Sequence, residues 1–184
     1  MKKVFITGNT SGIGLALSEL MISQGYDVRG GSRSTGWDVS EEKNFHKVYE
    51  CDILVNNAYH KYGQLSLLKK TYERWQGQEK TIVNVGSAMK DIIKHRPRNK
   101  MNYNIAKKSV EIFSFWIADN DRKCRSMMYN PGFVDTPLAR GAMIDWPPEE
   151  QQEALSRAMD VNECAKTILF MIEAKHTFRE ITHM

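Results

Sequence analysis

Short apolar runs alternate with longer segments of helical periodicity along this chain. Residues 4–6 form the first apolar run, which leads directly into a Gly-rich turn. Residues 13–23 follow with apolar side chains at helical spacing, and Gly25 is placed to end that helix. A second strand is expected over residues 26–31. The order strand, Gly-rich loop, helix and strand is a βαβ unit, which predicts a parallel sheet.

The rest of the chain continues this alternation. Further strands are expected over residues 52–55, 81–85, 126–129 and 178–182, and helices over residues 41–49, 64–76, 103–119 and 161–174. The sequence contains no internal repeat, low-complexity tract or linker. We therefore expect residues 1–184 to form a single α/β domain with a Rossmann-like, doubly wound parallel sheet.

Composition and charge narrow the class of protein. The chain is 41% hydrophobic and 26% charged, as in ordinary globular domains, and its apolar runs are far shorter than the roughly 20 residues that span a bilayer. The three cysteines are widely spaced and odd in number, which favours a reducing, cytoplasmic setting. A net charge of +4 suits an anionic ligand but is too small to indicate a nucleic acid. We expect neither a membrane nor a nucleic-acid partner.

The Gly-rich turn has the features of a phosphate-binding loop. Glycines allow a tight turn and a close approach of the backbone, and free N–H groups at the start of a helix face an anion. A strand–helix turn that is merely rich in glycine is the alternative, but its position after the first strand favours a nucleotide. The candidate residues are Gly8, Asn9, Thr10, Ser11, Gly12, Ile13 and Gly14.

The end of the second strand indicates which nucleotide binds. A site for NAD(H) usually has an acidic residue there, whereas this chain has Ser32 and Arg33. Arg33 can pair with a 2′-phosphate, and Ser32 adds a hydroxyl. The sequence therefore favours NADP(H) over NAD(H), with a solvated loop cation as the other interpretation of Arg33.

Three side chains have the chemistry of an acid/base site. Tyr103 and Lys107 lie one turn apart on a predicted helix, where the ammonium favours the phenolate and lowers the pKa of the tyrosine. Ser87 follows the strand at 81–85 and can hold a substrate oxygen beside Tyr103. Taken separately, these residues also fit an ordinary surface pair and a turn serine.

These pieces together resemble the short-chain dehydrogenase/reductase family, in its non-epimerase branch, over nearly the whole chain. The resemblance implies an NADP(H)-dependent carbonyl reductase or alcohol dehydrogenase with a small carbonyl or alcohol substrate, often assembled as a homodimer or homotetramer. The matching segments, in family order, are residues 7–14, Asp38-Val39, Asn56-Asn57-Ala58, Gly86-Ser87, Tyr103 with Lys107, and residues 131–136.

The resemblance also implies roles for individual residues. Ser87 would polarise the substrate carbonyl, Tyr103 would donate the proton, and Lys107 would bind the nicotinamide ribose and lower the pKa of Tyr103. The remaining cofactor contacts it implies are Asp38 and Val39 at the adenine, Asn56, Asn57 and Ala58 along the adenosine ribose, and Pro131, Gly132, Val134 and Thr136 at the nicotinamide end.

The chain departs from the family in three places. Only four residues separate Arg33 from Asp38, too few for the usual crossover helix. We therefore expect either a tight loop between the second and third strands or a vestigial third strand, and a sheet that is narrower or partly uncovered on one face. Tyr59 stands where the family has a glycine. The helical Asn of the family's proton relay has no counterpart between Ala58 and Val83, so the relay is either absent or replaced by another group such as His60 or water.

Two further segments border the predicted site. Residues 89–101 carry five basic side chains that either attract an acidic substrate or form a solvated loop. Residues 138–148 stand where the family has its substrate lid, and their apolar side chains fit either a lid or the core. A nucleotide-binding sensor with little or no turnover is the alternative function, favoured by the lost crossover helix and the missing Asn.

Overall fold

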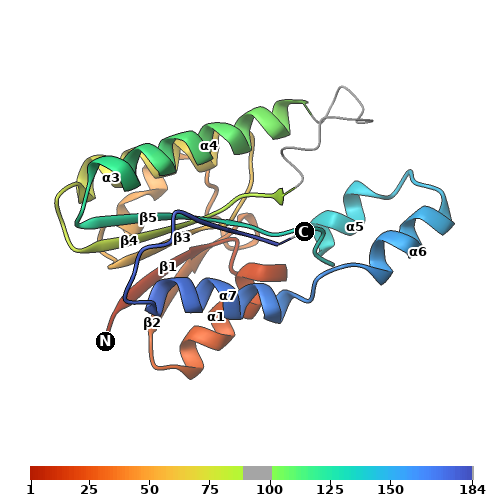
Figure 1. The fold of residues 1–184 in the computed structure, drawn as a ribbon, viewed down its shortest axis with the longest axis horizontal. Helices are drawn as coiled ribbons and strands as arrows, with labels where there is room; N and C mark the ends of the chain where they lie inside the picture. Colours follow the sequence, from red (N-terminus) through yellow and green to blue (C-terminus); the bar gives the residue numbers. More distant parts are fainter. Residues whose placement is uncertain (89–100, 184) are drawn as a thin grey trace.

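A single parallel sheet organises the computed structural model, which describes residues 1–88 and 101–183 (Figure 1). Its strands stand in the order β2-β1-β3-β4-β5-β6, and every neighbouring pair is parallel. This confirms the predicted Rossmann-like, doubly wound sheet. The strands are β1 (Lys3–Thr7), β2 (Asp27–Gly31), β3 (Ile53–Asn56), β4 (Lys80–Val85), β5 (Cys124–Asn130) and β6 (Glu180–Thr182).

Helices cover both faces of the sheet (Figure 1). The helices α1 (Gly12–Ser23) and α7 (Val161–Glu173) pack on one face, and α3 (Gly63–Trp75) and α4 (Met101–Asn120) pack on the other. Two short helices, α5 (Pro137–Ala142) and α6 (Pro148–Ser156), extend beyond the ends of the strands. This arrangement leaves the strand ends between the two helical layers as the place for a site.

The alternation of side chains along β1 divides the core in two. Val4 and Ile6 point toward α1 and α7, and Phe5 points toward α3 and α4. All three side chains are at most 1% exposed. Because both faces of a parallel sheet are covered, its strands appear in the sequence as continuous apolar runs, which is why they were predictable.

The connection from β2 to β3 is the shortened crossover that the sequence predicts. Residues 32–52 form no strand, so the sheet is narrow and β2 is its edge. The helix expected over residues 41–49 forms only in part: a 3-10 turn (Glu42–Asn44) is followed by the one-turn helix α2 (His46–Tyr49). A local reason is that the Trp37 indole N–H donates to the Asn44 carbonyl, a group that would otherwise accept a helical amide.

The sequence allowed for a sheet that is partly uncovered on one face. Beside this connection, side chains cover that face. Trp37 packs against Phe5 with ring centroids 5.2 Å apart, and Phe45 lies 6.5 Å from Trp37. Gly31 makes room for this indole, because a Cβ there would lie 2.4 Å from the Trp37 ring. Large side chains from irregular turns thus cover the part of the sheet that a crossover helix would otherwise cover.

The edge strand β2 carries charge. Arg29 lies 3.1 Å from Glu50 and 3.6 Å from Asp27, with all three side chains partly exposed. Exposed ion pairs of this kind contribute little to stability, so their effect lies in the polarity they give to the edge.

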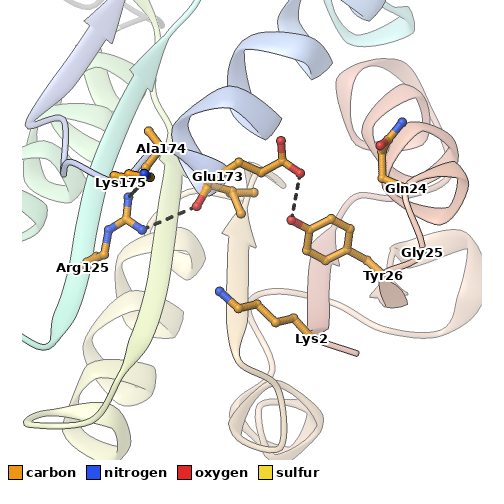
Figure 2. A pocket seen from close by; sticks show the side chains of 9 residues that line it. Lys2, Gln24, Gly25, Tyr26, Arg125, Glu173, Ala174 and Lys175 are labelled. Carbon is orange, nitrogen blue, oxygen red and sulfur yellow. Dashed lines mark hydrogen bonds between the residues drawn. The ribbon is translucent and has the colours of Figure 1, made fainter.

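A basin of about 570 Å³ lies at the opposite end of the sheet, where the strands begin (Figure 2). Tyr26 donates a hydrogen bond to Glu173 over 3.2 Å. Arg125 donates to the backbone carbonyls of Met171 and Ala174, each over 3.2 Å, at the end of α7. A cation that binds the last carbonyls of a helix stabilises its carboxyl end, so these contacts are structural.

Candidate active site

The predicted site residues gather at one edge of the sheet. Gly8 follows β1, Asn57 follows β3, Ser87 follows β4 and Pro131 follows β5. Because parallel strands all end at the same edge, the topology brings these loops together. Open α/β sheets bind their ligands at this edge.

The Gly-rich loop has a backbone that side chains would disturb. Gly8 and Gly12 have φ angles of +72° and +54°, in the left-handed region. Gly14 has no room for a side chain, since a Cβ there would lie 2.2 Å from the Gly8 carbonyl oxygen. Ser11 makes no side-chain capping hydrogen bond, and no acidic residue occupies the first turn of α1. The start of α1 is therefore suited to an external anion.

Thr7 joins this loop to the loop after β3. Its hydroxyl oxygen accepts hydrogen bonds from the backbone N–H groups of Asn57, over 2.8 Å, and Ala58, over 2.7 Å. The Asn57 side chain donates in return to the Thr7 carbonyl over 2.9 Å. Asn57 and Ala58 thus lie beside Gly8, and Thr7, the first residue of the matched segment 7–14, supports both loops.

The segment 131–136 closes the loop from the other side. A Cβ on Gly12 would lie 3.0 Å from the Thr136 methyl carbon, so these two residues are neighbours. The Thr136 hydroxyl accepts from the Ala139 N–H over 3.2 Å and caps α5. Gly132 is half-buried, whereas Pro131 and Val134 are buried, and Val134 belongs to the core.

Three hydroxyl groups meet at the end of β2. Thr10 lies 3.0 Å from Ser32 and 3.1 Å from Ser34, and the two serines lie 2.8 Å apart. Arg33 lies between these serines in the sequence, and its side chain is exposed. Asn9 packs over Gly30, where a Cβ would lie 2.3 Å from the Asn9 amide carbon. Thr10 and Ser34 extend the predicted pair of Ser32 and Arg33 into a polar cluster.

Asp38 and Val39 lie in the connection that follows. The backbone N–H of Ser40 and then its hydroxyl donate to the Asp38 carboxylate and lower the pKa of Asp38. His60 also contacts Asp38, over 3.4 Å. Val39 is 4% exposed and packs in the core. His60 thus lies beside Asp38, a residue of the connection after β2.

The catalytic candidates lie across α4 and the end of β4. Lys107 is 3% exposed, and its Nζ atom lies 5.8 Å from the centre of the Tyr103 ring. Ser87 is 8% exposed and stands between Gly86, whose N–H bonds the Tyr129 carbonyl over 2.7 Å, and Ala88, whose N–H bonds the Pro131 carbonyl over 2.8 Å. The Ser87 loop is thus fixed against the end of β5.

Gln64, in the first turn of α3, is a site residue that the sequence analysis missed. It is 1% exposed, and its Oε1 atom accepts a hydrogen bond from Lys107 over 3.0 Å. The Asn56 side chain is fully buried. It donates hydrogen bonds to the Gln64 carbonyl over 2.9 Å and to the Asn84 side-chain oxygen over 3.0 Å, so it supports Gln64 from inside the protein. Its only signal in the sequence is an amide side chain at the start of a predicted helix, in a region where the family carries an Asn.

The predicted lid contains both buried and exposed apolar residues. Met143 is 2% exposed, whereas Leu138 and Ile144 are 68% and 76% exposed. Arg140 forms an ion pair with Asp135 over 2.6 Å at the start of the lid. The basic segment, with Lys90, Lys94, Arg96, Arg98 and Lys100, lies outside the described residues.

Residues 1–88 and 101–183 contain no cluster of three potential metal ligands. No helix in this part of the chain has the length and apolar character to cross a membrane. Cys51, Cys124 and Cys164 are free and buried.

Known structures of similar shape identify the architecture. A 3-alpha-hydroxysteroid dehydrogenase from Pseudomonas sp. B-0831, complexed with NADH, superimposes with a TM-score of 0.77 and 20% identity over 98% of this chain and 94% of its own. A small-chain dehydrogenase in complex with NADPH gives 0.77 and 19% over 100% and 96%, and a short chain dehydrogenase/reductase family protein gives 0.75 and 19% over 98% and 94%.

The chain has the short-chain dehydrogenase/reductase fold. In this fold, the Gly-rich loop, Ser87 and Tyr103 stand at the edge of the sheet where the strands end. No family model and no curated protein matches the sequence. The likeness therefore concerns the short-chain dehydrogenase/reductase fold, and the chemistry must be argued from the residues themselves.

Proposed function

We propose that this protein is an NADP(H)-dependent oxidoreductase that interconverts a small carbonyl compound and its alcohol. The observation that carries the proposal is the buried Lys107 ammonium beside the Tyr103 ring, at the same sheet edge as the Gly-rich loop. A buried cation next to a phenol favours the phenolate form, and this tunes a tyrosine for proton transfer.

The loops fit a dinucleotide. Gly8, Gly12 and Gly14 keep side chains out of the turn where a pyrophosphate would lie against the start of α1. Arg33 and the hydroxyl cluster of Thr10, Ser32 and Ser34 offer one charge and three hydroxyls to a 2′-phosphate. The further cofactor contacts in this proposal are Asp38, Asn57, Ala58 and residues 131–136.

Each catalytic side chain has a separate task. Tyr103 transfers a proton between its hydroxyl and the substrate oxygen, and Ser87 donates a hydrogen bond to that oxygen. Lys107 stabilises the phenolate and binds the nicotinamide ribose. The nicotinamide, when bound, supplies or accepts the hydride. The protein itself contributes position and charge.

The test has two stages. Binding of NADPH and NADH is measured by calorimetry, and NADPH consumption is then followed with a panel of aldehydes and ketones, using Tyr103→Phe as the inactive control. We expect tighter binding of NADPH and turnover of at least one carbonyl class. NADPH binding without turnover would favour the alternative, a nucleotide-binding sensor. A wild-type protein that binds neither NADPH nor NADH would exclude both functions.

We also propose that the protein assembles as a homodimer or homotetramer. Ile112 and Trp116 on α4 are 68% and 50% exposed, which gives this helix an apolar outer surface. Sedimentation analysis of the wild type and of Ile112→Lys tests this assembly.

A further inference from the structure

The Lys107 side chain, on α4, is held by groups from two other elements. Its Nζ atom donates to the Val85 carbonyl at the end of β4 over 2.8 Å and to Gln64 Oε1 on α3 over 3.0 Å. Lys107 and Gln64 are 3% and 1% exposed. A buried ammonium requires such acceptors, because burial otherwise favours its neutral form.

The Gln64 amide can serve this purpose in only one orientation. Its Nε2 group donates to the Asn56 carbonyl and, over 3.0 Å, to the Val85 carbonyl. Because an amide nitrogen donates and does not accept, a flipped amide would direct N–H groups at the ammonium and oxygen at two carbonyls. The carbonyls at the ends of β3 and β4 therefore fix Oε1 toward Lys107.

The charge on the acceptors matters as much as their position. Gln64 Oε1 and the Val85 carbonyl are both neutral, so they stabilise the ammonium without cancelling its charge. A carboxylate at the same distance would offset most of the field that the ammonium exerts on Tyr103. The distance from Lys107 Nζ to the Tyr103 ring centre, 5.8 Å, is short enough for that field to act.

We propose that Gln64 is a positioning residue that holds the Lys107 ammonium with a neutral oxygen, so that the ammonium stays charged beside Tyr103. The proposal rests on the proposed function, since it concerns the acid/base role of Tyr103. It adds a residue from α3 to a site otherwise built from α4 and the strand ends.

Two substitutions separate the two parts of the proposal. Gln64→Met keeps the length of the side chain but replaces the amide oxygen by a weakly accepting thioether, so Lys107 should lose its proton at a lower pH. Gln64→Glu keeps the shape but puts a carboxylate beside the ammonium. Both changes weaken the cation seen by Tyr103, and both should raise its pKa by about one unit or more.

The titration of Tyr103 is read directly, without cofactor or substrate. The chain has seven tyrosines, so the tyrosinate absorbance of each protein is compared with that of the same protein carrying Tyr103→Phe, and the difference belongs to Tyr103. Thr71→Val is the matched control: Thr71 lies on α3, is fully buried, and its hydroxyl has no hydrogen-bond partner among the described residues. This control should leave the Tyr103 titration unchanged.

The outcomes distinguish this proposal from the proposed function. An unchanged Tyr103 titration in folded Gln64→Met and Gln64→Glu would overturn the positioning role, even if the wild type reduces carbonyls. An alkaline shift in a protein that turns over no carbonyl would support the positioning role and contradict the function. If the variants fail to fold, NMR of the wild type with 15N-labelled lysine decides: slow exchange of the Lys107 Nζ protons supports the proposal, and the rapid exchange of a surface lysine overturns it.

Discussion

The ring of Tyr59 lies edge-on against the ring of Tyr103, with centroids 4.8 Å apart and planes inclined at 68°. Lys107 Nζ lies 5.5 Å from the Tyr59 ring, so this second phenol shares the surroundings of the catalytic candidate. Burial raises the pKa of Tyr59, which keeps its hydroxyl protonated near neutral pH. Tyr59 is thus placed to support Tyr103 through the contact between their rings.

Replacing Tyr59 by Ala should lower carbonyl turnover by up to about tenfold, because an aromatic pair of this geometry is worth about 0.5–1.5 kcal/mol. NADPH affinity should change less. Steady-state kinetics measure both effects. Tyr62→Ala, in the same loop and 50% exposed, is the control and should behave like the wild type. Equal turnover for the two variants would mean that the Tyr59 contact is incidental.

Tyr103→Phe removes the proton donor and keeps the ring. We expect turnover to fall by at least about 10²-fold, within the usual range for general acid–base catalysis. Folding and NADPH binding should persist, as measured by thermal melting and calorimetry. Near-normal turnover in this variant would refute the mechanism.

Arg33→Ala should weaken NADPH binding by about 10- to 100-fold, since a charge-assisted hydrogen bond contributes about 1.5–3 kcal/mol. NADH affinity should hardly change, because NADH lacks the 2′-phosphate. The control is Arg122→Ala, an exposed arginine before β5 at the other end of the sheet. An equal loss for both nucleotides would remove the basis for phosphate recognition by Arg33.

Gly14→Ala places a methyl group against the Gly8 carbonyl, at 2.2 Å before relaxation. We expect a loss of about 1–3 kcal/mol in the free energy of unfolding and weaker binding of both nucleotides, since the loop must shift. Chemical denaturation measures the first effect. Gly141→Ala on α5 has open space around it and should be neutral or slightly stabilising. A Gly14→Ala protein as stable as the wild type would contradict the packing argument.

The stability of the protein should fall in acid partly through Asp52. The Lys3 backbone N–H donates to this carboxylate, and Lys80 pairs with it over 3.1 Å; together they lower the pKa of Asp52 below its ordinary value. A lowered folded-state pKa gives stability that is present above the unfolded pKa and lost as the pH falls through the folded one. Asp52→Asn should therefore melt earlier than the wild type at neutral pH and more nearly with it in strong acid. A difference in melting temperature that does not depend on pH would contradict this assignment.

Local patterns predict the six strands and the long helices well, because both faces of the sheet are covered and the apolar runs are continuous. The connection after β2 was harder to predict. Its fold depends on Trp37 and Phe45 packing on Phe5 from distant positions, and no periodicity encodes such contacts.

The candidate site also combines features that local patterns predict with contacts between distant residues that they do not. Spacing along one helix predicts that Tyr103 and Lys107 lie together, and the Gly-rich loop follows from its place after β1. The contact of Gln64 with Lys107 joins residues 43 positions apart, so no local signal reveals it. Asn56 was expected at the cofactor, but the structure buries its side chain in the network below.

The polar character of the edge strand β2 affects whether the sheet can pair with other extended segments. β2 reads Asp-Val-Arg-Gly-Gly, whereas its neighbour β1 reads Lys-Val-Phe-Ile-Thr, so the boundary strand has lost the apolar character of the interior. A strand boundary offers unpaired backbone groups to any extended segment nearby, and the charges around Arg29 discourage such association between separate molecules. The polar edge at β2 therefore favours a sheet that ends within one molecule over one that continues into a neighbouring molecule.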